Sequence, residues 1–422
     1  MKPKTKFQKQ VFEASEKLPP LTEKQLKWAY QNCFEHIGRR LKSGLITCLD
    51  CSHSWTDKTK EKYCTCPHCS AKLVIYDTKK YVFYDFQYFC ILTVFGGFQV
   101  LRFFFVNKKS KAGEKATCSY SEVVQRWVAS DGKHITIARL RNTAFGATNW
   151  NFSSPLEIRP ERHVHNITPV CVFPRMQLIS ELKRSGFDGN FHSLTPFELF
   201  QSLLSSSRAE TLLKTKQTGL LHHFVNRNFK NIDDYWASIK ICIRNGYNIS
   251  DASIWCDYID LLRFFDKDLH NAKYVCPADL KTEHDKYVVK KREWQKRQKK
   301  EQIKIKALED NRKFKEMKSH FFGVKFTDGL INVRVLESAE EVMQEGDALH
   351  HCVFANEYHL KPDTLLFSAY IGDKRLETVE LSLSQFKVLQ SRGACNKNTE
   401  YHDRIIELVN KNVSIIQKRL VA

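Results

Sequence analysis

The sequence lacks the features that would direct the chain into or across a membrane. Its first ten residues, MKPKTKFQKQ, are basic and contain no apolar core of a signal peptide. The most apolar stretch, residues 81–106, contains Asp85 and Arg102, is broken by Gly96-Gly97 and is rich in aromatic and β-branched residues. This pattern is typical of two adjacent strands joined by a turn and not of a transmembrane helix. We therefore expect a cytoplasmic protein without a membrane span.

Acidic residues are scarce relative to basic ones, and no segment repeats with a fixed period. The 422 residues include 67 Lys and Arg against 47 Asp and Glu, a net charge of +20. Such a balance attracts phosphate groups and favours a nucleic acid, DNA or RNA, as the partner. The alternative is that the charge only keeps the protein soluble. The missing period argues against a repeat architecture, and the length allows roughly two to four domains.

Disulfides are not expected from the fourteen cysteines, because most are scattered singly, as in proteins of a reducing compartment. Four of them form two close pairs, Cys48-x2-Cys51 and Cys66-x2-Cys69. Each pair can occupy a tight turn, and two such turns make the tetrahedral sulfur site that zinc prefers. A four-cysteine site is closed, so the spacing predicts a structural zinc ribbon. Cys64 and His53 are nearby donors that can replace one ligand.

The order of these patterns predicts a multidomain α+β protein. The expected parts are N-terminal helices (1–43), a zinc ribbon (44–73), an antiparallel β-rich module (74–175), an α-helical domain (176–280), a basic helical connector (281–319) and a C-terminal α/β domain with an antiparallel meander (320–422). Thr22 and Thr195 are expected to begin helices, the second of which continues through Leu213, and further helices are expected from Ser338 to about Gly346 and over residues 403–420. The middle domain offers no catalytic signature. Most aromatic residues of the β-rich module are expected to fill its core, with base stacking as the alternative.

Residues 281–318 carry fifteen Lys and Arg against seven Asp and Glu. No heptad runs through the segment, so a long solvated helix is favoured over a coiled coil. It is either an arm that contacts phosphates or a spacer with solvated charges. The candidate nucleic-acid-binding residues are Lys290, Lys291, Arg292, Lys296, Arg297, Lys299 and Lys300.

A string of unusual residues follows in the C-terminal part. It runs Leu349-His-His-Cys-Val353, Tyr358, Thr378-Val-Glu-Leu381, Gln390-x-Arg-Gly393 and Asn396. Over about residues 330–420 this order resembles the PcfJ-like family, and the ribbon followed by strands resembles its longer members. The resemblance implies a setting of mobile DNA: plasmids, conjugative elements or phages. Proteins of conjugation or of a phage are then expected partners.

The strand expected over residues 375–383 alternates apolar and polar residues, so Thr378, Glu380 and Ser382 share one face. We expect a polar cleft there, with the candidate catalytic residues His351, Cys352, Glu380, Gln390, Arg392 and Asn396. Acid–base work by His351 or Glu380 with charge neutralisation by Arg392 suits phosphodiester chemistry, and Mg²⁺ is a candidate cofactor. Binding of nucleic acid without chemistry is a second use of the cleft, and Cys352 as a nucleophile is a third. The alternative is a hydrogen-bonded network that only stabilises the domain.

Together these patterns favour a nucleic-acid-binding protein of a mobile genetic element, acting in DNA transfer or maintenance. One alternative is a nuclease or nucleic-acid-processing enzyme that uses the C-terminal cleft. Another is a zinc-stabilised adaptor that binds proteins of the transfer machinery.

Overall fold

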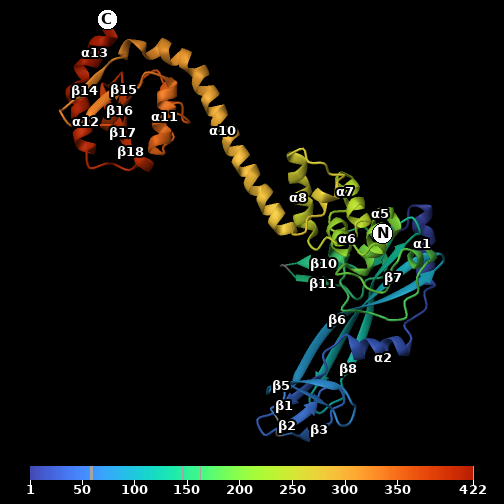
Figure 1. The fold of residues 1–422 in the computed structure, drawn as a ribbon. Helices are drawn as coiled ribbons and strands as arrows, with labels where there is room; N and C mark the ends of the chain where they lie inside the picture. Colours follow the sequence, from blue (N-terminus) through green and yellow to red (C-terminus); the bar gives the residue numbers. More distant parts are fainter. Residues whose placement is uncertain (58–59, 145–146, 162, 422) are drawn as a thin grey trace. The chain divides into compact units, whose positions relative to one another are not determined.

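The computed structural model describes residues 1–57, 60–144, 147–161 and 163–421. Positions 58–59 of the expected ribbon, 145–146 and 162 of the expected β-rich module and 422 at the chain end lie outside the described residues. The chain divides into two compact units, residues 1–284 and 285–422, each taken by itself below (Figure 1). Both are mixed structures of helices and sheets, in agreement with the predicted α+β class.

The first unit begins with two capped helices, α1 (Lys6–Glu16) and α2 (Glu23–Asn32). Thr22 caps α2 as the sequence predicts, in a capping box with Gln25. A small sheet of order β3-β2-β1-β5-β4 follows. Its strands are β1 (Ile37–Arg40), β2 (Leu45–Cys48), β3 (Ser54–Thr56), β4 (Tyr63–Thr65) and β5 (Lys72–Asp77). The helical interpretation of residues 1–43 is therefore wrong for β1, which pairs with β2 and β5.

The second sheet of this unit has the order β12-β9-β8-β7-β6-β13. Gly96 and Gly97, both at positive φ, make the tight turn between β6 and β7, which confirms the predicted hairpin. The small sheet lies at one end of its long strands (Figure 1). The strands are β6 (Val82–Phe95), β7 (Phe98–Lys111), β8 (Thr117–Val128), β9 (His134–Ala138), β12 (Glu157–Arg159) and β13 (Cys171–Val172), with a separate hairpin of β10 (Arg141–Ala144) and β11 (Ala147–Trp150).

Short helices complete the first unit. They are α3 (Ser180–Arg184), α4 (Pro196–Ser205), α5 (Ser207–Lys214), α6 (Thr218–Val225), α7 (Ile232–Arg244), α8 (Ala252–Phe264) and α9 (Ala272–Val275). Thr195 caps α4 through a capping box with Glu198, as expected. The sequence suggested one helix through Leu213, but Ser206 has extended backbone and separates α4 from α5.

The basic segment forms one long helix, α10 (Leu280–Lys318), as predicted, and the boundary between the units falls inside it. None of the helices in the described part of the chain is both long enough and apolar enough to cross a bilayer.

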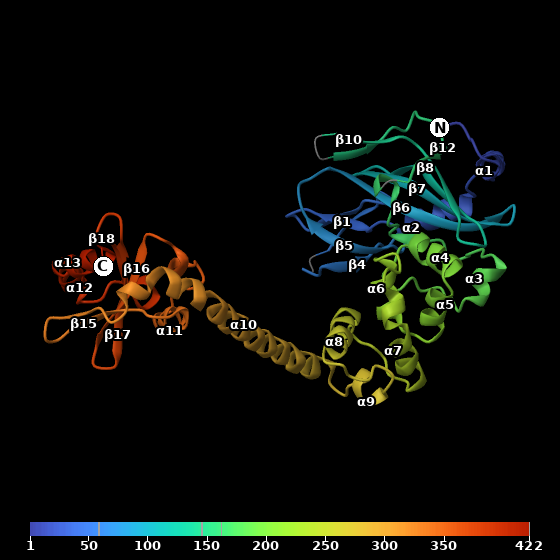
Figure 2. The same cartoon turned by 90° about the horizontal axis from the view of Figure 1, so that it is seen from above.

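The second unit is built on an antiparallel meander of order β14-β15-β16-β17-β18, in agreement with the predicted meander, to which β14 is an unexpected addition (Figure 1; β15 to β18 are also labelled in Figure 2). The strands are β14 (Lys325–Thr327), β15 (Asn332–Val335), β16 (Thr364–Ile371), β17 (Lys374–Ser382) and β18 (Lys387–Gly393). The helices are α11 (Ala339–Leu349), α12 (His402–Lys411) and α13 (Val413–Val421). The expected single helix over 403–420 is broken at Asn412, and α11 continues past the predicted end at Gly346 to Leu349.

Each face of this meander has its own apolar core. On one face Val379 and Leu381 pack with residues of α12 and α13, such as Ile405 and Ile416. On the other face Leu366 packs with α11 and with the C-terminal half of α10. Because neighbours along a strand point to opposite faces, Thr378 and Glu380 lie on the α11 side, as the alternation predicts.

Candidate metal centre, basic helix and C-terminal pocket

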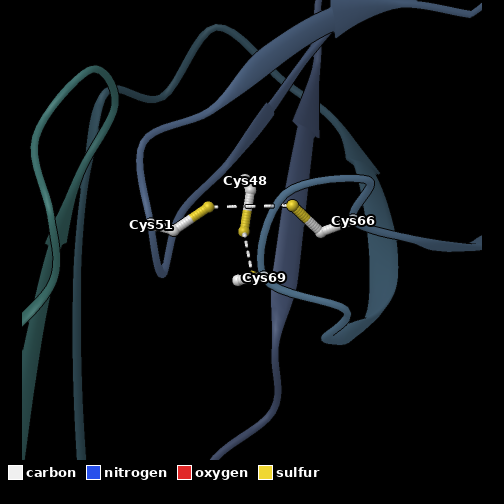
Figure 3. Close-up of side chains that lie close together, drawn as sticks. All are labelled: Cys48, Cys51, Cys66 and Cys69. Carbon is white, nitrogen blue, oxygen red and sulfur yellow. Dashed lines mark hydrogen bonds between the residues drawn. The ribbon is translucent and has the colours of Figure 1, made fainter.

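The four paired cysteines meet at one point in the small sheet. Their sulfur atoms point toward one another and all lie within 4.8 Å (Figure 3). The Sγ–Sγ distance is 3.8 Å between Cys48 and Cys69 and 3.7 Å between Cys51 and Cys66. A tetrahedron with metal–sulfur bonds of about 2.3 Å has edges of about 3.8 Å. The cluster therefore has the size and donor set to hold a metal ion.

Two matching turns position these thiols. In the first, Ser52 N donates to Cys48 O and Cys48 N donates to His53 O; in the second, Ser70 N donates to Cys66 O and Cys66 N to Ala71 O. Ser52 and Ser70 occupy the left-handed region, with φ of 69° and 59°. The repeated geometry explains why both pairs have the same x2 spacing. In the part of the chain that the structure describes, the metal-ligand cluster does not include the spare donors Cys64 and His53.

The thiols of this cluster differ in the direction of their pKa shifts. Burial raises the pKa of the Cys48 thiol. Burial also acts to raise the pKa of Cys66, but N–H groups of Cys69 and His68 outweigh it, and the net pKa lies below the usual value. A bound cation would stabilise all four thiolates, because ligating cysteines are deprotonated.

The seven basic residues predicted to contact nucleic acid all lie on α10, within eleven residues or roughly 16 Å of helix. All except the half-buried Lys291 are exposed. At 100° per residue these six exposed cations fall within about half of the helix circumference. Only Glu293 carries an acidic side chain between Lys290 and Lys300. We call the exposed face made by these cations the basic helix surface.

The predicted cleft of the second unit exists as a cavity of about 240 Å³ beside α11. Five of the six candidate catalytic residues line it, namely His351, Cys352, Gln390, Arg392 and Asn396. Asn356, Tyr358 and Thr378 complete its polar wall. We call this cavity the C-terminal pocket.

Glu380, the sixth candidate, is buried beneath the pocket wall. It accepts a hydrogen bond from Gln390 Nε2 at 2.7 Å and another from Thr364 Oγ1 at 3.0 Å. The register pairs Glu380 directly with Gln390, so the glutamine side chain orients over the carboxylate. Among the described residues that line the pocket there is no carboxylate, and this donor set does not favour Mg²⁺, which prefers oxygen ligands with negative charge.

His351 is held at the pocket by a chain of hydrogen bonds that the sequence did not reveal. Its Nε2 lies 2.8 Å from Thr378 Oγ1, and Thr378 Oγ1 donates to Glu345 Oε1 at 3.3 Å. Since the threonine proton goes to the carboxylate, its oxygen accepts from His351 Nε2–H, which leaves Nδ1 as the basic nitrogen. Arg375 forms an ion pair with the same carboxylate, with its Nε 2.9 Å from Glu345 Oε2.

Burial shifts the pKa values of both His351 and Glu345. It lowers the pKa of His351, so the neutral imidazole that can accept a proton is favoured. Burial also raises the pKa of Glu345, whose side chain is fully buried, while Ser368, Arg375 and Thr378 oppose that shift. Arg392 lies at the exposed rim and donates to Asn398 Oδ1 at 2.6 Å. The pocket thus combines a neutral, oriented base with a cation.

Glu345 and Glu377 are the buried acids that the sequence analysis missed. Glu377 accepts from Ser391 Oγ and from the backbone and side chain of Thr399, and it lies 2.8 Å from His402 Nδ1. These hydrogen bonds outweigh burial and lower its pKa. Glu345 lies on α11, and no local pattern predicts how this helix aligns with β17. Glu377 could have been noticed, because it directly precedes Thr378 in the sequence.

Comparisons with known proteins match only part of the chain. Neither the curated proteins nor the solved structures that were compared include a match. The ribbon and the long sheet lie outside the matched residues, whereas the match begins in α8, earlier than the sequence suggested. Residues 254–406 match the family model of the PcfJ-like protein, which confirms the predicted resemblance for the C-terminal region of the chain.

Proposed function

We propose that the protein binds nucleic acid and serves a mobile genetic element of the plasmid, conjugative or phage type in DNA transfer or maintenance. It would act in the cytoplasm, with zinc in the four-cysteine cluster as a structural ion. The observation that carries the proposal is the basic helix surface, where six exposed cations share half of one helix over eleven residues. The net charge of +20 and the PcfJ-like match support it.

Phosphate contacts release counterions, so the proposal predicts a strong dependence of binding on salt. The test compares the full chain with a variant carrying Lys296→Gln, Arg297→Gln, Lys299→Gln and Lys300→Gln. Glutamine keeps helix propensity and removes only the charge. Labelled single-stranded DNA, duplex DNA and RNA are titrated between 50 and 300 mM salt. The slope of log K against log salt should fall by about 3 in the variant, at 0.7 to 0.9 per lost phosphate contact.

A matched control removes the same charge elsewhere, through substitution by Gln of four exposed lysines at the N-terminus, Lys4, Lys6, Lys9 and Lys17. It should leave the slope within about 1 of the parent value. Binding without salt dependence, or no binding near physiological salt, would refute the proposal. Retention of partner proteins after nuclease treatment would instead favour the adaptor.

The His351–Thr378–Glu345 chain favours a second candidate function, nucleic-acid processing in the C-terminal pocket. His351 Nδ1 would take a proton from the attacking hydroxyl or water, and Arg392 would stabilise charge on the phosphoryl oxygens. Glu345 would act as a positioning residue that fixes the imidazole through Thr378. The alternative is that these hydrogen bonds only stabilise the second unit.

Cleavage assays on the same labelled nucleic acids distinguish these two roles, with Mg²⁺, Mn²⁺ or chelator present. His351→Asn should abolish cleavage, and Thr378→Val should shift the pH profile while substrate binding stays unchanged. Asp373→Asn, in the exposed turn between β16 and β17, is the control. No cleavage by the parent protein, or equal cleavage by His351→Asn, would exclude this second function for these substrates.

A further inference from the structure

The long sheet of the first unit carries an exposed aromatic surface. Alternation along β6 places Tyr84, Phe86 and Tyr88 on one face. The register pairs Tyr88 with Phe105 of β7, which puts Phe105 on the same face. Phe152 packs on Phe105 with ring centroids 5.3 Å apart. We call these five residues the aromatic platform.

Three of the five platform rings are exposed to solvent, whereas the rings packed against α2 are not. On the opposite face Phe89 and Phe104 are buried against α2, as expected for core residues. Tyr84, Phe86 and Phe152 are 69%, 61% and 45% exposed. Large apolar rings that gather on a surface commonly mark a binding site. Phe103, two residues before Phe105 on the same face, is buried, so the exposed rings of this face are confined to the end of the sheet that carries Tyr84 and Phe86.

The arrangement of the rings and their neighbours indicates the kind of ligand. Phe86 stacks on Phe105 at 5.4 Å and 22°, which presents a flat apolar surface. Lys109 Nζ lies 5.8 Å from the centre of the Tyr84 ring. The neighbouring strand supplies Thr117, Ser119 and Ser121 to this face, since they pair with Lys109, Asn107 and Phe105.

Charge on this face complements a phosphate backbone. Among the described residues that this face takes from positions 82–88, 105–111 and 117–121, none is acidic. Lys111, at the edge, is paired with Glu114 of the following turn, so Lys109 is the main cation beside the rings. Rings that accept bases, with cations and hydroxyls that accept phosphates, are the parts of a single-strand stacking site.

We propose that the aromatic platform binds single-stranded nucleic acid, DNA or RNA, by stacking bases on Tyr84 and Phe86; this inference rests on the proposed nucleic-acid binding. Residues two apart on a strand are about 6.6 Å apart. That is roughly twice the 3.4 Å step of a strand in a duplex, so the spacing suits unstacked bases. A duplex offers no base faces along its length, which makes the single strand the partner of this surface.

The test measures the affinity of the full chain for labelled dT15, rU15 and a blunt duplex over a salt series. Tyr84→Ala/Phe86→Ala should weaken single-strand binding at least roughly tenfold, because each stacked base contributes about 1–3 kcal/mol. Its duplex affinity and its salt slope should not change. Tyr84→Phe, which retains a ring, should bind like the parent. The dT15 and rU15 arms show which nucleic acid is preferred.

Tyr120→Ala is the matched control, because Tyr120 is an aromatic residue of β8 that is 45% exposed on the opposite face of the same sheet. It should leave single-strand affinity unchanged. Unchanged affinity in Tyr84→Ala/Phe86→Ala would overturn the platform and indicate a protein contact there, while loss of the salt slope in the α10 variant would still support the proposed function. No binding of any nucleic acid would overturn both.

Discussion

Lys318, the last residue of α10, should make the stability of the second unit depend on pH, by an amount that follows from its surroundings. Its side chain is only 1% exposed, and its Nζ donates to Pro362 O at 2.7 Å. Burial lowers the pKa of Lys318 from 10.5 to about 8, and the nearby Asp363 offsets part of that shift. Lys318 therefore binds its proton more weakly in the native unit than in the unfolded chain.

The sign of the pH dependence follows directly. Between pH 8 and 10.5 the unfolded chain binds the proton and the native chain does not, so the free energy of unfolding rises with pH in this window. A shift of 2.5 units corresponds to about 3.4 kcal/mol, of which about 2 kcal/mol is recovered between pH 7.5 and 9.5. Lys318→Met removes this dependence and loses one hydrogen bond of about 1 kcal/mol.

We expect Lys318→Met to be more stable than the parent by about 2 kcal/mol at pH 7.5, with the advantage gone at pH 9.5. Urea unfolding of the full chain, read by hydrogen-exchange pulses on peptides of β16 and β17, reports this unit alone. Lys315→Met, at an exposed position of the same helix, is the control and should show no such change. An equal difference between Lys318→Met and parent at both pH values would refute the reasoning.

Three further predictions concern the metal cluster and the second unit. Cys48→Ser should release the bound metal and unfold the small sheet, since metal binding there is folding energy, and Cys64→Ser should retain it; metal analysis of freshly purified protein that finds no metal in the parent would contradict this. Gly393→Ala should cost about 2 kcal/mol, because its Cβ would lie 2.7 Å from Leu376 O, and an unfolding midpoint equal to that of the parent would contradict the close approach. Glu377→Gln should lower the free energy of unfolding by about 3 kcal/mol at pH 7. Because the pKa of Glu377 is lowered, the stabilisation by its carboxylate is present above pH 4.5 and is lost as pH falls further. Denaturant titrations at pH 7 and pH 3.5 should therefore show that the stability difference between variant and parent shrinks at the lower pH.

Local patterns predicted those parts of the fold that local forces determine. Capping boxes marked the start of α2 and α4, and Gly96-Gly97 marked the turn of the long hairpin. The two Cys-x2-Cys turns could be placed for the same reason, because each is closed by hydrogen bonds within six residues. β1 escaped prediction although it pairs with the nearby β2; it lies in the centre of the small sheet, and its second partner, β5, is 37 residues further along the chain.

The candidate site shows the same division. The string from His351 to Asn396 predicted which residues gather at the pocket, because the meander brings β17 and β18 together. It did not predict that Glu380 would lie under Gln390. A register shift after Glu380 aligns these two side chains, and a bulge of this kind leaves little trace in an alternating sequence. The partner of His351 also depends on how α11 crosses β17, which is a matter of tertiary packing.

The metal cluster is linked to the aromatic platform by Asp50, which lies between the first two cysteine ligands. Its carboxylate is 2.6 Å from Lys108 Nζ on β7 and 2.6 Å from His36 Nδ1, and its backbone oxygen accepts from Ala116 N beside β8. A closed site with four protein ligands has no position for substrate, so the metal can influence binding only through the backbone that it fixes. Lys108 is adjacent to Lys109, the cation beside the platform, and the turn that holds Asp50 contacts both β7, through Lys108, and the start of β8, through Ala116. Release of the metal should therefore weaken stacking on the platform, while phosphate contacts of the basic helix surface, which belongs to the second unit, should persist.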